Sequence, residues 1–325
     1  VSCSLMCQGG FDQADDRYMG MLGMHGTKTA AEALKHCDLF LAVGTRFSDR
    51  VICNANLFAR HCPIIQIDID PAEFNKNIDV TLKLGGDAKQ ILSLLNEKLE
   101  QQNHKEWIEQ IKAWKKEYPL RQEAIDPNGV TPQMLFDALN ELTKSEAIIA
   151  TEVGQHQMWA AQFYEFRHPR QFITSGGLGT MGFGLGAAMG AQVANPDKKV
   201  INIAGDGSFH MNMNEMATAV SQKLPIIVLI FNNHVLGMVR QWQTLFYEHR
   251  YSQTSIDRKT DYVKLAEAFG GKGFQIKTRQ DIEPVMREAL ACKVPCIIDC
   301  WIDKDDCVYP IIPPGKSAKD IIFGN

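Results

Sequence analysis

Two apolar runs separated by an amphipathic segment dominate the second half of the chain. The runs, 200–204 and 226–231, are rich in Val and Ile, and the segment between them has helical spacing. This pattern predicts a βαβ unit with two buried parallel strands. Polar turns follow both strands, at 205–208 (Gly-Asp-Gly-Ser) and 232–233 (Asn-Asn). We expect both turns at the carboxyl edge of one sheet, where open α/β sheets bind ligands.

The same alternation extends over most of the chain. Apolar runs in its last part predict strands at 147–154, 171–175, 200–204, 226–231, 273–278 and 295–303. Helical patterns intervene at 131–144, 181–194, 211–223, 261–269 and 280–291. The first part has strand patterns at 39–44 and 64–70 and a shorter one before Gly85. Strands that alternate with helices predict an α/β fold with two doubly wound parallel-sheet domains, the first of them partial.

A charged helix with one aromatic stripe is predicted between these parts. Its apolar side chains recur at helical spacing: Trp107, Ile111, Trp114 and Tyr118. We expect this stripe to pack against a domain rather than to bind a ligand. The sequence Asp-Pro-Asn-Gly then breaks the chain before residue 130. The predicted organisation is a first domain at 1–100, a helical linker at 101–129 and a second domain at 130–325.

Composition excludes several classes of partner. Apolar residues make up 45% and charged residues 22% of the 325 residues, which is typical of globular proteins. The formal net charge of −4 offers no basic surface for nucleic acid or an anionic membrane. No uncharged apolar run approaches the ~18 residues of a membrane span. We expect neither a nucleic-acid nor a membrane partner, and a cytoplasmic location with a plastid as the alternative.

The nine cysteines predict free thiols in a reducing compartment. Cys296 and Cys300 fall within one strand-like run, and Cys292 precedes them at the same spacing, so these three share no ligand-sized loop. The cysteines of the first half are Cys3, Cys7, Cys37, Cys53 and Cys62. We expect none of these to join a histidine in a metal site, because zinc-ligand spacing is absent.

Asp206 and Asn233 carry hard oxygen donors of the kind that Mg²⁺ prefers, and Mg²⁺ completes its shell with phosphate oxygens and water. Gly207 allows a close approach of the backbone, and the N–H groups of the following helix favour an anion. The pattern therefore favours a diphosphate held through a divalent cation. The alternative is an ordinary strand–turn–helix in which Asp206 caps the helix.

A second alternative comes from residues 177–182, which read Gly-Leu-Gly-Thr-Met-Gly and match G-x-G-x-x-G. In a dinucleotide-binding domain this loop would hold the dinucleotide, and Asp206 at the end of the next strand would bind the ribose. This alternative gives no role to Ser208 or to the turn at 232–233.

Several motifs together resemble those of acetolactate synthase (acetohydroxyacid synthase) catalytic subunits, which are thiamine-diphosphate enzymes. One is GDG followed by NN, with Asn233 27 positions after Asp206. Other segments resemble the family in the family's order: 21–26 (MLGMHG), 153–159 (VGQHQMW), 176–182 (GGLGTMG) and 237–243 (GMVRQWQ). By this resemblance the chain begins inside the middle domain and lacks the first domain.

The resemblance implies a thiamine diphosphate site in the second domain. It assigns Asp206, Asn233 and the backbone of Val235 to Mg²⁺. Gly179 and Met181 would contact the aminopyrimidine, with Met181 holding the cofactor in a bent shape. The other residues assigned to this cofactor are Val153, Gly154, Gln155, His156, Gly207 and Ser208.

The resemblance also implies FAD in the first domain, where the flavin of this family is mainly structural. The residues assigned to FAD are Gly23, Met24, His25, Gly44, Thr45, Arg46, Asp68, Ile69, Gly86 and Asp87. The residues assigned to the substrate are Asp49, Arg50, Met238, Val239 and Trp242. Of these, Trp242 would favour 2-ketobutyrate over pyruvate as the second substrate.

The implied reaction is decarboxylation of pyruvate on thiamine diphosphate and ligation of the two-carbon unit to a second 2-keto acid, in branched-chain amino acid biosynthesis. The family's activating glutamate belongs to the first domain of a partner subunit. Active sites would therefore form between chains of a homo-oligomer, and this chain alone is expected to be inactive. A regulatory subunit is a further expected partner. The pair Gln241-Trp242 argues against other thiamine-diphosphate carboligases, decarboxylases and oxidases, which stay as alternatives.

Overall fold

The computed structural model describes residues 1–256 and 258–324, and the chain divides into two compact units. The first unit comprises Val1–Ser4, Asp15–Leu120 and Tyr309–Phe323. The second comprises Leu5–Ala14, Arg121–Val308 and Gly324. The change of unit after Leu120 falls inside the predicted linker, and the domain boundaries at 100 and 129 stay predictions.

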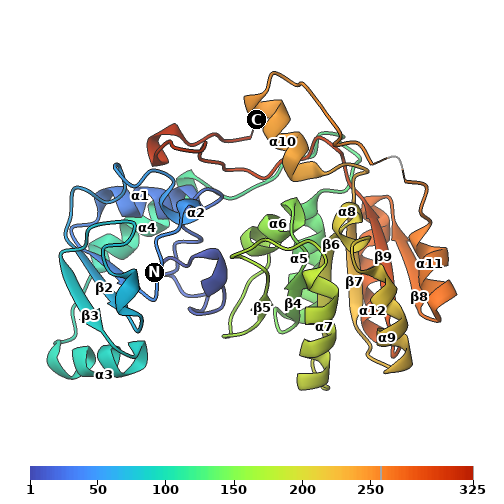
Figure 1. The fold of residues 1–325 in the computed structure, drawn as a ribbon, viewed down its shortest axis with the longest axis horizontal. Coiled ribbons are helices and arrows are strands. Elements are labelled where there is room, and N and C mark those ends of the chain that lie inside the picture. Colours follow the sequence, from blue (N-terminus) through green and yellow to red (C-terminus); the bar gives the residue numbers. More distant parts are fainter. Residues whose placement is uncertain (257, 325) are drawn as a thin grey trace. The chain divides into compact units, whose positions relative to one another are not determined.

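The second unit is built on a six-stranded parallel sheet (Figure 1). Its strands, in sheet order, are β5 (Phe172–Ile173), β4 (Ile148–Thr151), β6 (Val200–Gly205), β7 (Ile227–Asn232), β9 (Cys296–Trp301) and β8 (Lys272–Ile276). Each of these strands lies within or next to one of the predicted apolar runs. All residues of β4, β6 and β7 are buried, which explains why these runs are apolar throughout rather than alternating.

Helices cover both faces of this sheet, as predicted. One face packs against α5 (Pro132–Thr143), α6 (Gln155–Phe163) and α12 (Arg279–Ala291). The other packs against α7 (Phe183–Ala194), α9 (Met216–Ser221) and α11 (Tyr262–Phe269). Along β6, Ile201 and Ile203 join the first layer while Val200 and Ala204 join the second. Short helices α8 (Asp206–Phe209) and η1 (Leu5–Cys7) and the helix α10 (Gly237–Phe246) complete the unit.

The single helix predicted at 211–223 is wrong in its extent. The structure has a 3₁₀ turn, η3 (Met213–Glu215), followed by the shorter α9. Asn212 explains the difference, because its side-chain Nδ2 donates to the carbonyl of Gly182 at 3.3 Å. This contact with another loop holds the chain outside the helical path just before the helix begins.

The first unit contains a three-stranded parallel sheet. Its strands, in sheet order, are β1 (Phe40–Val43), β2 (Ile64–Asp68) and β3 (Leu82–Gly85). Its helices are α1 (Lys28–His36), α2 (Asp49–Ile52), α3 (Ala88–Lys98), α4 (Lys105–Glu117) and the short η2 (Pro71–Glu73) and η4 (Ala318–Asp320). The central strand β2 is largely buried, whereas Leu41 of β1 and Leu82 of β3 are 45% and 48% exposed.

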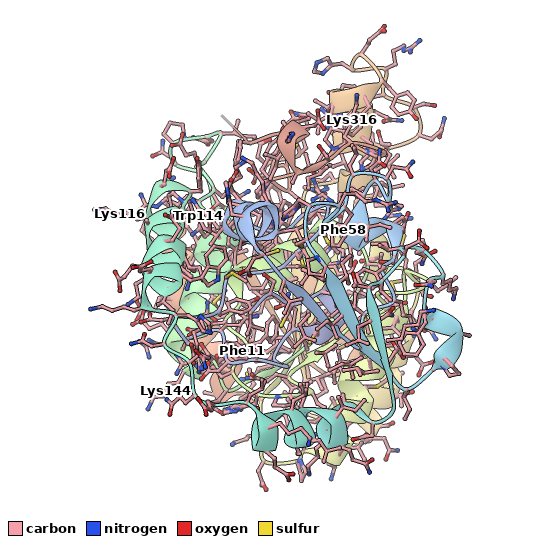
Figure 2. All side chains as sticks on the ribbon, turned by 90° about the vertical axis from the view of Figure 1, so that its left-hand side faces the viewer. Phe11, Phe58, Trp114, Lys116, Lys144 and Lys316 are labelled. Atoms are coloured by element: carbon pink, nitrogen blue, oxygen red, sulfur yellow. The ribbon has the colours of Figure 1, made fainter. Side chains whose placement is uncertain are left out.

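The aromatic stripe of α4 packs against α1, which confirms the structural role predicted for it. Ile111 and Trp114 are buried, and the Trp114 ring stacks on His36 with 5.6 Å between ring centroids. Figure 2 shows Trp114 on the side of α4 that faces α1, whereas Lys116 points away from it. Within residues 1–256 and 258–324, none of the helices combines the length and the low charge that crossing a bilayer would require.

Candidate functional site

The polar turns after β6 and β7 lie at the same edge of the six-stranded sheet. The two strands are neighbours, and their register pairs Gly205 with Phe231. Asp206 and Asn233 therefore follow paired residues by one and two positions, at the carboxyl edge. Both side chains are buried, with exposed fractions of 4% and 7%. Burial of a carboxylate and a carboxamide at one edge requires partners for their oxygens.

Asp206 does not cap the helix that follows it, so this alternative is wrong. Gly205 occupies the N-cap position of α8, and Asp206 is the first helical residue. The capping contacts come from Ser208, whose Oγ accepts from the Gly205 N–H at 3.1 Å and donates to its carbonyl at 3.1 Å. Burial raises the pKa of Asp206 to about 6. A buried carboxylate in this position is suited to a cation.

Asn233 begins a sharp turn. His234 adopts a left-handed conformation with φ of 59°, which is uncommon for a residue with a side chain. The Oδ1 of Asn233 accepts from the Val235 N–H at 3.2 Å. Among the described residues, no hydrogen bond has the Val235 carbonyl as its acceptor. That carbonyl is thus available as a further oxygen donor two residues from Asn233.

The turn at the end of β4 lies against the turn at the end of β6. A Cβ atom at Gly205 would lie 2.9 Å from Nδ1 of His156, and His156 Nε2 is 3.4 Å from Ser208 Oγ. Burial lowers the pKa of His156 to about 3, so its imidazole is neutral at physiological pH. The neutral ring can donate one hydrogen bond and accept another.

Gln155 links the β4 turn to α10. Its Nε2 donates to Gln241 Oε1 and to the Asp306 carbonyl, both at 2.9 Å. Its Oε1 is buried and has no hydrogen-bond partner in the described structure. The backbone of Gly237 approaches so closely that a Cβ there would overlap this Oε1 and lie 2.9 Å from Asn233 Nδ2. A buried acceptor therefore points to the start of α10, close to Asn233.

Protein side chains pack closely against the backbone of Gly207, whereas the predicted approach of a diphosphate to this glycine stays a prediction. A Cβ at Gly207 would lie 2.9 Å from the side chains of Leu236 and Ile256. The Tyr262 hydroxyl adds a contact of 3.4 Å with the Asp206 carbonyl. These contacts fix the backbone of the turn that carries the Asp206 side chain.

The loop 177–182 is not a dinucleotide-binding loop, so this alternative is wrong. It follows β5, and β4 separates β5 from β6, whereas a dinucleotide site needs its glycine-rich strand beside the strand with the acidic residue. The amino end of α7 is also occupied. Glu152 accepts from the Gly182 N–H at 2.5 Å and from the Leu185 N–H at 3.1 Å. Its carboxylate fills the position that a diphosphate would take.

Glu152 and Gln241 were not predicted as site residues. Burial raises the pKa of Glu152, and hydrogen bonds from backbone N–H groups at the start of α7 offset part of this rise. The signal in the sequence is the one acidic residue in the run 147–154, which is predicted as a strand. Gln241 is fully buried and bridges Gln155 to the Val308 backbone, accepting from its N–H at 2.8 Å and donating to its carbonyl at 3.0 Å.

The other residues assigned to this site lie on the loop before α7 and on α10. The nearest neighbour of a Cβ at Gly179 would be Val153, at 3.8 Å, and Met181 is half-buried in the same loop. On α10, Met238 packs against the core and Val239 is 49% exposed. Trp242 meets Phe246 edge to face at 5.4 Å. Among the described residues, no hydrogen bond or ring contact joins Trp242 to the turn at 205–208.

In the first unit, three of the assigned segments follow the ends of its three strands. Gly44 follows β1 and donates to the Ile67 carbonyl at 2.8 Å, and Gly86 follows β3 and donates to the Asp68 carbonyl at 3.0 Å. Gly44 has a φ of 62° and open space at its Cβ position. The carbonyl of Thr45 accepts a hydrogen bond from Gln66, and that of Arg46 accepts one from Asn77. Ile69 is 74% exposed. Asp87 is the N-cap residue of α3.

The loop with Gly23, Met24 and His25 lies beside α2. Met24 donates its N–H to the Arg50 carbonyl at 2.8 Å. The structure thus brings the loop assigned to FAD next to Asp49 and Arg50, which form an exposed ion pair at 3.3 Å. Burial lowers the pKa of His25 to about 4, so this imidazole is neutral.

The structure places two of these cysteines beside a histidine, a grouping that the spacing along the sequence did not predict. Possible ligand atoms of Cys37, His61 and Cys62 lie within 4.8 Å of one another. The parallel pairing of β1 and β2 brings these residues together, and spacing along the sequence does not show it.

Comparisons with known proteins agree with this architecture. Residues 152–300 match the family model of the thiamine pyrophosphate enzyme C-terminal TPP binding domain, and residues 1–95 match that of the central domain. The chain is 40% identical over 325 residues to the acetolactate synthase isozyme 2 large subunit of Escherichia coli, covering 99% of this chain and 58% of that protein. It is 41% identical over 336 residues to the mitochondrial acetolactate synthase catalytic subunit of Saccharomyces cerevisiae, covering 99% and 49%.

A third relative is the probable acetolactate synthase large subunit of Methanocaldococcus jannaschii. It is 42% identical over 332 residues, covering 99% of this chain and 56% of that protein. The chain thus spans about half the length of the curated relatives that it matches.

Proposed function

The chain belongs to the thiamine pyrophosphate enzyme family, and we propose that it is the cofactor-binding part of an acetolactate synthase catalytic subunit. The proposed reaction takes a two-carbon unit from pyruvate, with loss of CO₂, and joins it to a second 2-keto acid, either pyruvate or 2-ketobutyrate. The names of the relatives support this reaction over that of other thiamine-dependent enzymes.

The observation that carries the proposal is the Asp206 carboxylate. It is 4% exposed, follows a buried strand and takes no part in capping α8. With Asn233 and the Val235 carbonyl it forms a set of three oxygen donors, which suits Mg²⁺ in number and chemical type. We propose that these three residues hold Mg²⁺, and that the ion holds the diphosphate of the cofactor.

The surrounding residues fit a diphosphate and a heterocycle. The neutral His156 lies beside the Asp206 turn, and the unpartnered amide oxygen of Gln155 can accept a hydrogen bond from an N–H or O–H group of the cofactor. We propose that Val153, Gly154, Gln155, His156, Gly207 and Ser208 hold the diphosphate side, and that Gly179 and Met181 contact the aminopyrimidine. When bound, the cofactor supplies the carbon centre to which the keto acids add. The protein's part is to fix the cofactor's position and to exclude water around it.

For the first unit we propose FAD, held by the residues that follow β1, β2 and β3 together with Gly23, Met24 and His25. The open space at Gly44 and the position of Gly44, Asp68 and Gly86 at one carboxyl edge support this proposal. From the resemblance we further propose substrate contacts from Asp49, Arg50, Met238, Val239 and Trp242. The terms "large subunit" and "catalytic subunit" in the names of the relatives support assembly with a regulatory subunit.

The test is a calorimetric titration of the chain with thiamine diphosphate, carried out once in the presence of Mg²⁺ and once in the presence of EDTA. Binding is expected only with Mg²⁺, and Asp206→Ala is expected to weaken it at least about tenfold. The matched control is Asp197→Ala, because Asp197 is exposed and precedes the same strand, β6, at its other end. Binding without Mg²⁺, or equal binding by Asp206→Ala, would contradict the proposal.

A further inference from the structure

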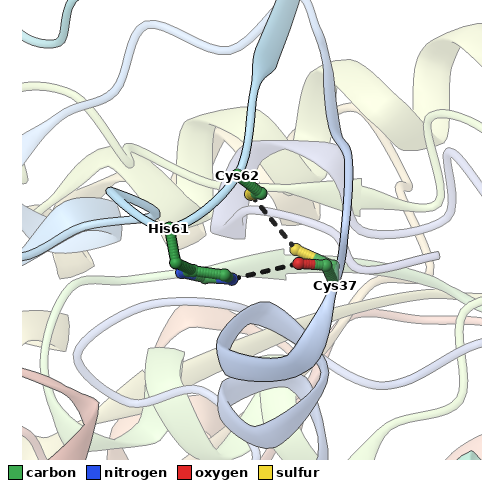
Figure 3. A group of neighbouring side chains, drawn as sticks. All are labelled: Cys37, His61 and Cys62. Carbon is green, nitrogen blue, oxygen red and sulfur yellow. Dashed lines mark hydrogen bonds between the residues drawn. The ribbon is translucent and has the colours of Figure 1, made fainter.

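Cys37, His61 and Cys62 form a cluster of metal-ligating side chains in the first unit (Figure 3). The two sulfur atoms lie 3.7 Å apart, and His61 Nε2 lies 3.1 Å from the Cys37 carbonyl oxygen. One possible ligand atom from each residue falls within 4.8 Å of the others. Both cysteines are half-buried, whereas His61 is exposed. The cluster therefore has a protected side and a side open to solvent.

The fold builds this cluster through parallel strand pairing. Phe40 of β1 pairs with Ile64 of β2, and the Phe40 N–H donates to the Pro63 carbonyl at 3.0 Å. Cys37 ends α1 shortly before β1, and Cys62 lies shortly before β2. Because parallel strands enter a sheet at the same edge, the two thiols meet although 25 residues separate them.

The spacing of the sulfur atoms suits a tetrahedral ion. Two thiolates bound to zinc at ~2.3 Å with tetrahedral angles are about 3.8 Å apart. The observed 3.7 Å needs almost no movement to reach this value. A disulfide would instead require the sulfur atoms to close to ~2.05 Å.

We propose that Cys37, His61 and Cys62 bind one Zn²⁺ ion, with water as the fourth ligand. Thiolate and imidazole are ligands that zinc prefers, whereas Mg²⁺ and Ca²⁺ prefer oxygen. His61 is exposed, and a nitrogen of its ring lies within 4.8 Å of both sulfur atoms.

The effect proposed for the bound ion is on the stability of the first unit. It lies at the amino edge of the three-stranded sheet, and the residues proposed for FAD follow the strands at the carboxyl edge. The ion joins the end of α1 to the segment before β2, two parts of the chain that already meet through the contacts of Cys37 with His61 and Cys62. Since the ion binds the folded unit, it stabilises that unit against unfolding.

The test uses the reduced full chain, dialysed against Zn²⁺ and then against metal-free buffer, with Zn²⁺ per chain measured by atomic emission. Titration with Co²⁺ then reports the ligands, because thiolate ligands give intense ultraviolet charge-transfer bands and tetrahedral geometry gives strong visible bands. Oxygen ligands at a magnesium site give neither of these signals. One thiolate-bound ion per chain and a higher Tm with Zn²⁺ are expected.

The variants separate the proposal from adventitious binding. Cys37→Ser and Cys62→Ser should each abolish the cobalt bands and the Zn²⁺-dependent rise in Tm. His61→Ala, at an exposed position, should shift the visible bands and weaken Zn²⁺ binding. Cys53→Ser is the matched control, because Cys53 is a half-buried thiol of the same unit outside the cluster. It should bind like the unmodified chain.

Several results would overturn the proposal. One is the absence of bound Zn²⁺ and of thiolate bands in the reduced chain. Another is binding that persists in Cys37→Ser or Cys62→Ser. Cobalt bands unchanged in His61→Ala would show a two-thiolate site and would exclude the assigned ligand set.

Discussion

The six-stranded sheet of the second unit and the three-stranded sheet of the first are both parallel, yet they hold their strand-end polar groups differently. In the larger sheet, helices cover both faces, and Asp206 and Asn233 are buried in a connected set of turns. In the smaller sheet, strand residues such as Leu41 and Leu82 are exposed; of its strand-end carboxylates, Asp68 is buried and Asp87 serves as a helix cap at the surface. Burial on both faces is what gives a polar turn a fixed, water-poor environment.

The largest expected effect is a change in the free energy of unfolding that differs between matched Leu→Ala substitutions in the two sheets. Leu229→Ala in β7 should lower the free energy of unfolding by ~2–5 kcal/mol, because Leu229 is fully buried in the core and its removal leaves a cavity. Leu41→Ala in β1 should change it by about 0.5 kcal/mol, because Leu41 is 45% exposed. Urea denaturation followed by far-UV circular dichroism measures both. Equal losses would contradict the contrast in burial.

The second-largest expected effect is the change of the free energy of unfolding with pH that a buried carboxyl group of the second unit causes. Burial, with the nearby carboxylates of Asp303 and Asp305, raises the pKa of Asp306 to about 7. The folded state therefore binds the proton more tightly, so the stabilising contribution is complete below about pH 4 and is lost as the pH rises to about 7. Asp306→Asn should remove this loss, worth roughly 2–4 kcal/mol.

The measurement is the free energy of unfolding at several pH values from 4 to 8 for the unmodified chain, for Asp306→Asn and for the exposed control Asp197→Asn. The control should keep the pH dependence of the unmodified chain. If Asp306→Asn also keeps it, the carboxyl group does not titrate in this window and the burial argument fails.

The smallest of the three effects concerns helix α7. A Cβ at Gly184 would lie 2.6 Å from the Glu152 N atom of the strand edge, so Gly184→Ala should destabilise the chain by ~1–3 kcal/mol. Gly190 lies on the same helix with open space around it, and Gly190→Ala should stabilise the chain by about 0.5–1 kcal/mol. Thermal unfolding monitors both variants. A stabilising Gly184→Ala would show that α7 does not need this close approach.

Sequence patterns were most informative where burial is complete. The strands β6 and β7 were predictable because both of their faces are buried, so nearly every residue is apolar. The turn residues Asp206 and Asn233 were predictable because strands of one parallel sheet end at one edge. The shortening of α9 was not predictable, because it depends on the contact between Asn212 and Gly182 across two loops.

The candidate site was only partly predictable for the same reason. Glu152 accepts hydrogen bonds from backbone N–H groups at the amino end of α7, about 30 positions away. The sequence around Glu152 does not show which groups its carboxylate contacts. Cys37 and Cys62 meet because of strand register, which spacing rules for metal ligands ignore. Sequence reasoning located strand ends well, but it did not show which side chains meet across the fold.

The most direct test of the central claim is a crystal structure of the chain with thiamine diphosphate and Mn²⁺ in place of Mg²⁺, with anomalous scattering used to locate the ion. We expect one Mn²⁺ peak within about 2.2 Å of both an Asp206 carboxylate oxygen and the Asn233 side-chain oxygen. A peak bound to only one of these residues, or an ion located elsewhere in the second unit, would contradict the assignment.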